Sequence, residues 1–158
     1  MSTLHKNLSE FSTDQLPNVS QKTFAVLVSE WNEAITYALA EGAVTTLANH
    51  GVAGERIVQH TVPGSFELPL AAQKMASQDD IDAIICLGCV IQGETPHFDY
   101  VCQAVALGIK DVALKYDKPV IFGVLTTDTL EQAQDRAGGK HGNKGDEAAI
   151  TAIKMLTF

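Results

Sequence analysis

The sequence predicts one α/β domain in which a parallel sheet of four strands is covered by helices on both faces. Four short apolar runs alternate along the chain with longer segments of helical periodicity. The central run, which begins at Ala83, is apolar without interruption, as expected for a strand that is buried on both faces of a parallel sheet. The chain has 158 residues, of which 46% are apolar and 19% are charged, enough for one substantial core. A doubly wound α/β fold accommodates this pattern most simply.

The first half of the chain is predicted to form an arm, two strands and two helices. Residues 1–22 are polar and lack a sustained period, which predicts an N-terminal arm that does not pack on its own core and that a neighbouring subunit could order. The domain proper spans residues 23–158. We expect a strand over 23–29, a helix over 33–50 ended by Gly51, a strand over 56–61 and a short helix with Pro69 in its first turn. The residues expected on the inner faces of the two helices are Ile35, Leu39, Ala43 and Leu47, then Leu70, Ala71 and Met75.

The second half is predicted to add two strands and three helices. A central strand begins at Ala83, the helix after it runs to about Tyr116, and the fourth strand covers 120–125. A helix then ends near residue 137, a glycine-rich loop follows over 138–145, and a last helix covers 146–156. That helix is expected to bury Ala149, Ile150, Ile153 and Leu156, which recur at helical spacing.

Charge and hydropathy exclude several classes of partner. The formal net charge is −8 and the isoelectric point is near 4.9, whereas nucleic acids and anionic membranes both require a basic face. The first residues have no apolar core of signal-peptide length and no run of 18 apolar residues occurs, so we expect a cytoplasmic protein. His5, His50 and His60 lack metal-ligand spacing, and we expect no metal.

The three cysteines are expected to be reduced and structural. Cys86 and Cys89 have the spacing of a redox motif, but residues three apart in a strand point to opposite faces of the sheet. The two sulfurs should therefore not meet. Cys102 lies in apolar surroundings and leaves the number odd.

The chain is organised around residues 83–98, AIICLGCVIQGETPHF. The apolar half predicts a buried strand, and in the second half Thr95 suits the N-cap of a helix, Pro96 its first position and His97 its first turn. The free N–H groups and dipole of such a terminus favour a phosphate or another anion. The same field disfavours a charged imidazole, so we expect His97 to be neutral and able to accept a proton. The alternative is a histidine that makes an ordinary first-turn hydrogen bond.

Other candidate residues lie where ligands of parallel sheets bind, after the carboxyl ends of strands. Trp31 follows the first strand and could stack on a flat ligand or simply pack, and Glu67 follows the second and could bind ligand or only favour a helix start. The glycine-rich loop does not have the spacing of a nucleotide-binding motif. Arg136, Lys140 and Lys144 could instead bind a phosphate there, or the lysines could merely solvate the loop.

Four separated motifs resemble the lumazine synthase family: VPGSFELP at 62–69, GCVIQGETPHFDYV at 88–101, PVIFGVLTTDTLEQA at 119–133 and RAGGKHGNKG at 136–145. The resemblance runs from about residue 23 to 155 and implies a three-layer α/β/α, flavodoxin-like fold with strand order 2-1-3-4. The family condenses 5-amino-6-ribitylaminouracil with 3,4-dihydroxy-2-butanone 4-phosphate to 6,7-dimethyl-8-ribityllumazine in riboflavin biosynthesis, without a cofactor.

The resemblance also implies a role for each site residue. Trp31, where phenylalanine is commoner, would stack on the pyrimidine, and Val90 and Ile91 would contact the ring edge through their backbone. The residues that would bind the ribityl chain are Ser65, Phe66 and Glu67. His97 would be the acid and base, and Arg136 would hold the phosphate with the backbone of Glu94 and Thr95. Phe122 and Lys144 match positions that the family contributes from an adjacent subunit.

Family members form pentamers, and some assemble into hollow icosahedral shells. The loop at 136–145 lacks the insertion that resembles purely pentameric forms, which favours a sixty-subunit shell, whereas Pro17 disfavours strand pairing by the arm. Riboflavin synthase is a partner that such a shell could enclose. Two other hypotheses fit parts of the pattern: a flavin-binding electron carrier on a flavodoxin-like sheet, and a shell protein without activity.

Overall fold

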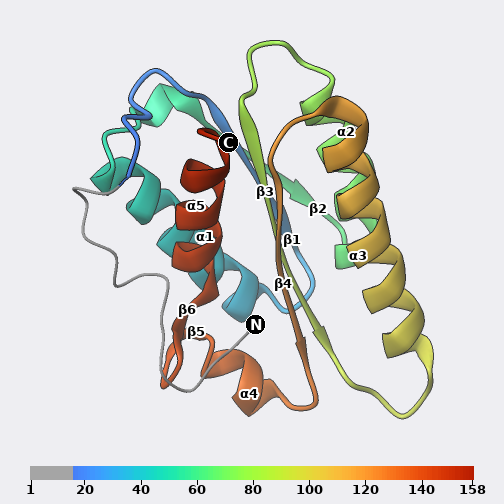
Figure 1. Ribbon diagram of the computed structural model, residues 1–158. Helices are drawn as coiled ribbons and strands as arrows, with labels where there is room; N and C mark the ends of the chain where they lie inside the picture. Colours follow the sequence, from blue (N-terminus) through green and yellow to red (C-terminus); the bar gives the residue numbers. More distant parts are fainter. Residues whose placement is uncertain (1–15) are drawn as a thin grey trace.

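The four predicted strands form one parallel sheet, as expected, in a computed structural model that describes residues 16–158. The strand order is β2-β1-β3-β4, with every neighbouring pair parallel (Figure 1). The strands are β1 (Phe24–Ser29), β2 (Ile57–Val62), β3 (Ala83–Ile91) and β4 (Val120–Thr127). The helices are α1 (Glu33–Asn49), α2 (Leu68–Ala76), α3 (His97–Tyr116), α4 (Leu130–Gln134) and α5 (Lys144–Met155).

Helices cover both faces of the sheet. Figure 1 shows α1 and α5 on one side and α2 and α3 on the other. Alternate residues of β1 supply the two cores: Val26 packs with the helices α1 and α5, and Leu27 packs with α2 and α3. The expected inner stripe of α1, from Ile35 to Leu47, is buried. Because every neighbouring pair is parallel, the carboxyl ends of all four strands lie at one edge of the sheet.

Cys86 and Cys89 lie in different cores, which confirms that they point to opposite faces of the sheet. Cys86 belongs to the core under α2 and α3, and Cys89 to the core under α1 and α5. Burial raises the pKa of Cys86 to about 12 and that of Cys89 to about 11. Thiols held in this way are inert packing groups.

The inner face of α2 differs from the prediction. The buried residues are Leu68, Ala72 and Ala76, whereas Leu70 is exposed and Ala71 and Met75 are only partly buried. The helix begins at Leu68, and residues at i, i+4 and i+8 share a face, so Leu70 points to the opposite side. Pro69 lies in the first turn, as predicted.

The start of α3 is also displaced by one residue. Pro96, not Thr95, is the N-cap, and no side chain caps the helix. The Pro96 carbonyl accepts hydrogen bonds from the N–H groups of Asp99 at 3.0 Å and Tyr100 at 3.5 Å. Because these are the first helical bonds, His97 becomes the first residue of the helix.

The glycine-rich segment is more ordered than the predicted loop. Two short antiparallel strands, β5 (Ala137–Gly139) and β6 (Gly142–Asn143), form a hairpin. The helix α5 begins directly afterwards at Lys144, two residues earlier than expected, because the Asn143 side chain caps it by accepting from the Gly145 N–H at 2.8 Å. Lys144 therefore belongs to a helix and not to a flexible loop.

The last part of the predicted arm packs on the domain. Val19 is buried and Leu16 packs against the same core, so the expectation that the arm makes no contact with its own core is wrong for residues 16–22. The remainder of the arm, and the question of pairing by a neighbouring subunit, lie outside the described residues. Of the helices in residues 16–158, none combines the length and apolarity that a membrane crossing requires.

Candidate active site

A pocket of about 720 Å³ opens where β1, β2 and β3 end and α3 begins. Seven of the predicted site residues line it together: Trp31, Ser65, Phe66, Glu67, Val90, Ile91 and His97. They come from four separate segments of the chain, which the parallel strand order brings to one edge of the sheet. An aromatic ring, a carboxylate and an imidazole thus face one cavity.

The turn after β1 presents Trp31 to solvent. Trp31 is 73% exposed as a residue, which leaves its indole accessible to a ligand. The next residue, Asn32, has a left-handed backbone with φ of 61°, and its Nδ2 donates to the Cys89 carbonyl at 3.0 Å. This bond fixes the turn against the end of β3. Sequence reasoning missed Asn32, although asparagine directly after a strand is a residue that tolerates such a turn.

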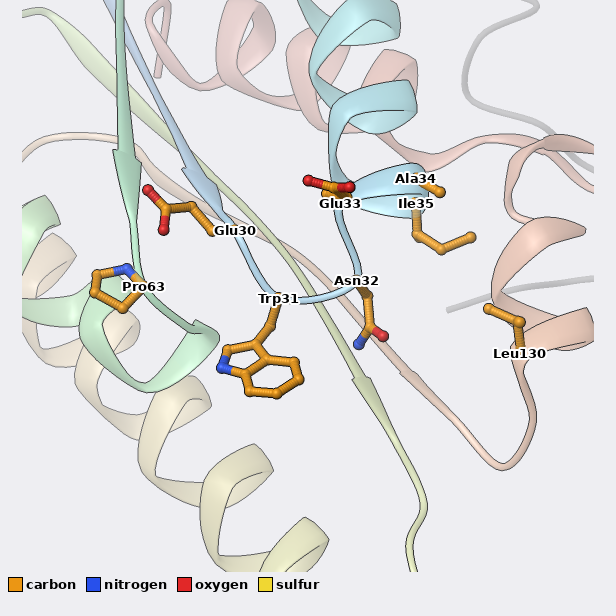
Figure 2. Close-up of a pocket in the computed structure, with 8 residues that line it drawn as sticks. All are labelled: Glu30, Trp31, Asn32, Glu33, Ala34, Ile35, Pro63 and Leu130. Carbon is orange, nitrogen blue, oxygen red and sulfur yellow. The ribbon is translucent and has the colours of Figure 1, made fainter.

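Trp31 also borders a second hollow of about 580 Å³, on the α4 side. Figure 2 shows Trp31 and Asn32 projecting to one side of the turn, with Pro63 from the end of β2 on one flank and Leu130 of α4 on the other. Trp31, Asn32 and Pro63 line both hollows. The indole of Trp31 is therefore accessible from two sides.

The segment after β2 forms the wall of the larger pocket. Residues Ser65–Glu67 make a 3₁₀ turn in which Phe66 is 59% exposed and Glu67 is also exposed. Ser65 is instead buried and turned toward the sheet, since a Cβ added to Gly88 would lie 2.5 Å from its Oγ. Phe66 and Glu67 can touch a ligand directly with their side chains, whereas Ser65 faces inward.

His97 stands at the mouth of the pocket as the first residue of α3 and is exposed. Tyr100 and Val101, one turn later, line the same pocket and were missed by the sequence interpretation. They lie three and four residues after His97, and residues at this spacing share a helix face, which is the sequence signal that could have found them. Glu94 and Thr95 lie in the exposed loop just before the helix, outside the pocket lining of residues 16–158.

Three further candidates, Arg136, Lys144 and Phe122, lie elsewhere in the described chain. The Arg136 Nη1 donates to the Gln132 carbonyl at 2.9 Å, and Lys144 forms an ion pair with Glu147 at 2.5 Å. Phe122 lies on the edge strand β4 and is 41% exposed. Within residues 16–158, none of the three lines the pocket that contains His97.

The fold and the pocket define a protein of the parallel α/β class with a pocket for a small molecule at the carboxyl ends of its strands. Comparison with known proteins identifies the family. The sequence profile of 6,7-dimethyl-8-ribityllumazine synthase matches residues 21–158. Proteins of that name are 62% identical in Cytophaga hutchinsonii, over 99% of this chain and 98% of the relative, and 54% identical in Parabacteroides distasonis, over 100% and 99%. The chain belongs to the 6,7-dimethyl-8-ribityllumazine synthase family.

Proposed function

We propose that this protein condenses 5-amino-6-ribitylaminouracil with 3,4-dihydroxy-2-butanone 4-phosphate, giving 6,7-dimethyl-8-ribityllumazine, phosphate and water. The observation that carries the proposal is the pocket in which Trp31, Glu67 and His97 meet, in a chain of this family. The reaction is the penultimate step of riboflavin biosynthesis, and the enzyme is a transferase. Membership of the family favours this reaction over flavin-based electron transfer.

The pocket supports binding of the pyrimidine substrate. The exposed indole of Trp31 would stack on the ring, while the backbone of Val90 and Ile91 at the end of β3 would contact its polar edge. Glu67 would accept hydrogen bonds from the ribityl hydroxyls beside Phe66. Ser65 would support this wall from behind, because its side chain is buried.

His97 would move the protons. The imidazole, which lines the pocket, could transfer protons as the imine forms with loss of water, accept a proton as the phosphate then leaves the four-carbon unit, and return one as the ring closes. Arg136 and the backbone N–H groups of Glu94 and Thr95 would hold the phosphate and stabilise the charge that develops on it. Orientation of two bound reactants would supply much of the remaining rate.

Three site candidates do not line the pocket, and this separation supports an active site that two subunits share. Arg136, Lys144 and Phe122 lie outside the His97 pocket of their own chain, so they would reach it from an adjacent subunit. We infer a cyclic pentamer, further assembled into a sixty-subunit shell in the cytoplasm, that could enclose riboflavin synthase. Such an assembly would leave each pocket between two subunits.

Turnover with one substrate omitted at a time tests the proposal. Lumazine absorbance and released phosphate should rise in equal amounts only when both substrates are present. His97→Ala and Arg136→Ala should slow both signals, whereas His60→Ala and Lys74→Ala, which alter exposed residues of β2 and α2, should not. A wild-type rate equal to that of the uncatalysed mixture would overturn the proposal.

A further inference from the structure

Two buried serine hydroxyls lie beneath the pocket. Ser29 is 0% exposed and Ser65 is 5% exposed, and neither Oγ atom has a hydrogen-bond partner among residues 16–158. Buried polar groups in native proteins are almost always satisfied, by protein groups or by ordered water. The two hydroxyls therefore require a partner.

Strand register places the two hydroxyls on the same face of the sheet. Along β1, Ala25 and Leu27 belong to the core under α2 and α3, so Ser29, two residues further, points to that face as well. Val28 pairs with Leu87, which makes Gly88 the next position opposite Ser29. The Ser65 side chain occupies the space above Gly88, 2.5 Å from where a Cβ would stand.

The geometry suits a single bridging molecule. Neighbouring strands are about 4.8 Å apart, so a side chain above Ser29 and one above Gly88 are separated by about that distance. A water molecule about 2.8 Å from each of two hydroxyls spans gaps up to about 5.6 Å. A Cβ at Gly88 would meet the Ser65 Oγ at 2.5 Å and the Leu68 Cδ1 at 3.1 Å, so the inward position of Ser65 requires a residue without a side chain there.

We propose that Ser29 and Ser65 hold one buried water molecule between the sheet and the Ser65–Glu67 turn, and that Ser29 is thereby a positioning residue for the ribityl chain. The turn forms the pocket wall that carries Phe66 and Glu67, and the shared water ties this wall to β1. The second half of the proposal rests on the proposed function. The water site itself does not.

A crystal structure of the wild-type protein at about 1.5 Å resolution tests the water site. Density for a water within hydrogen-bond distance of both Oγ atoms is expected, and it should be lost or displaced in Ser29→Ala and in Ser65→Ala. Direct contact between the two hydroxyls, or a wild-type structure without this water, would overturn the proposal. This result does not depend on any activity.

Steady-state kinetics test the positioning role. Ser29→Ala should raise the KM for the ribityl substrate about three- to tenfold and leave the KM for the four-carbon phosphate unchanged, because the wall contacts only the former. Ser29→Ala combined with Ser65→Ala should cost no more than either change alone, since both remove the same bridge.

Thr36→Val is the matched control. Thr36 of α1 carries another fully buried hydroxyl without a partner in the described residues, and it is absent from the lining of the pocket. Its isosteric replacement should leave both KM values unchanged. An equal rise of both KM values in Ser29→Ala would overturn the positioning role. A wild-type protein without turnover would instead overturn the proposed function, and the crystal structure would still test the water site. Should Ser29→Ala fail to fold, Ser65→Ala carries the same kinetic test.

Discussion

Trp31 is highly exposed and lines the candidate active site, so its replacement should weaken substrate binding without lowering the stability of the fold. Trp31→Ala is expected to raise the KM for the pyrimidine substrate roughly tenfold, because the stacking surface is lost. The melting temperature should stay almost unchanged, because the residue is already 73% exposed to water. Trp31→Phe should retain most of the affinity. Steady-state kinetics and thermal unfolding of the two variants check this, and a large loss of stability in Trp31→Ala would contradict it.

At the residue scale, the sequence predicted which residues line the pocket better than it predicted where their side chains point. Trp31, Glu67 and His97 meet in one pocket because each directly follows a strand or its loop, and position along the chain was enough to find them. Asn32 was missed because its role depends on a left-handed turn and a bond to Cys89, 57 residues away. The inward direction of Ser65 depends on the space above Gly88, which only the folded chain defines.

At the element scale, Asp82 ties the start of β3 to the segment before β1. Its carboxylate accepts from the Lys22 Nζ and from the Thr23 N–H, both at 2.8 Å. Partial burial alone would raise the pKa of Asp82, but these hydrogen bonds and the charge of Lys22 outweigh it and hold the pKa below its ordinary value of 3.8.

A lowered pKa in the folded state means that Asp82 stabilises the protein at neutral pH and loses this contribution as the pH falls through 3.8 and below. Asp82→Asn should therefore cost about 1 kcal/mol or less at pH 7, since the pair is partly exposed, and the difference from wild type should vanish in acid. Urea unfolding at several pH values measures it. Asp79→Asn, in the exposed turn nearby, is the control. It should change the free energy of unfolding neither at neutral pH nor in acid.

The contact of α1 with α5 depends on Gly145. A Cβ added there would overlap the carbonyl oxygen of Leu39, a backbone atom that cannot move aside without displacing α1. Gly145→Ala should therefore destabilise the protein by about 3 kcal/mol, or prevent folding. At Gly54 an added Cβ meets no atom of the described chain within 4 Å, so Gly54→Ala should change the free energy of unfolding by less than about 1 kcal/mol. Urea denaturation compares the two, and equal effects would contradict this account.

Strands were easier to predict than helix phase or the hairpin. The run 83–91 is apolar throughout and is buried on both faces as a central strand. The phase of α2 depends on a start at Leu68 that follows a 3₁₀ turn, so a pattern centred on Leu70 chose the wrong face. The hairpin at 137–143 has no apolar alternation, and it forms through glycines at positive φ, 106° at Gly138 and 72° at Gly142.

At the scale of the whole molecule, the pocket and the cationic residues occupy different parts of the chain. The hollow beside Trp31 extends toward α4, while Arg136 and Lys144 lie beyond that helix and are held by bonds within their own segment. A chain with a net charge of −8 has to bind a phosphate through local cations, and Arg136 and Lys144 do not line the His97 pocket of their own chain. Complementation between two inactive variants distinguishes this arrangement from a site within one chain.

We expect His97→Ala and Lys144→Ala each to lose most of their activity as pure assemblies, and their co-expression to restore part of it. In a cyclic oligomer each site would take His97 from one subunit and Lys144 from the next, so random mixing leaves about a quarter of the sites with both residues intact. Turnover of the co-expressed protein, normalised to wild type, gives this fraction, and sedimentation velocity shows that all assemblies have equal size. The two purified variants mixed without disassembly should remain inactive. Co-expressed protein that stays as inactive as its parents would place both residues in the same subunit's site, and a monomer at micromolar concentration would exclude the shared site altogether.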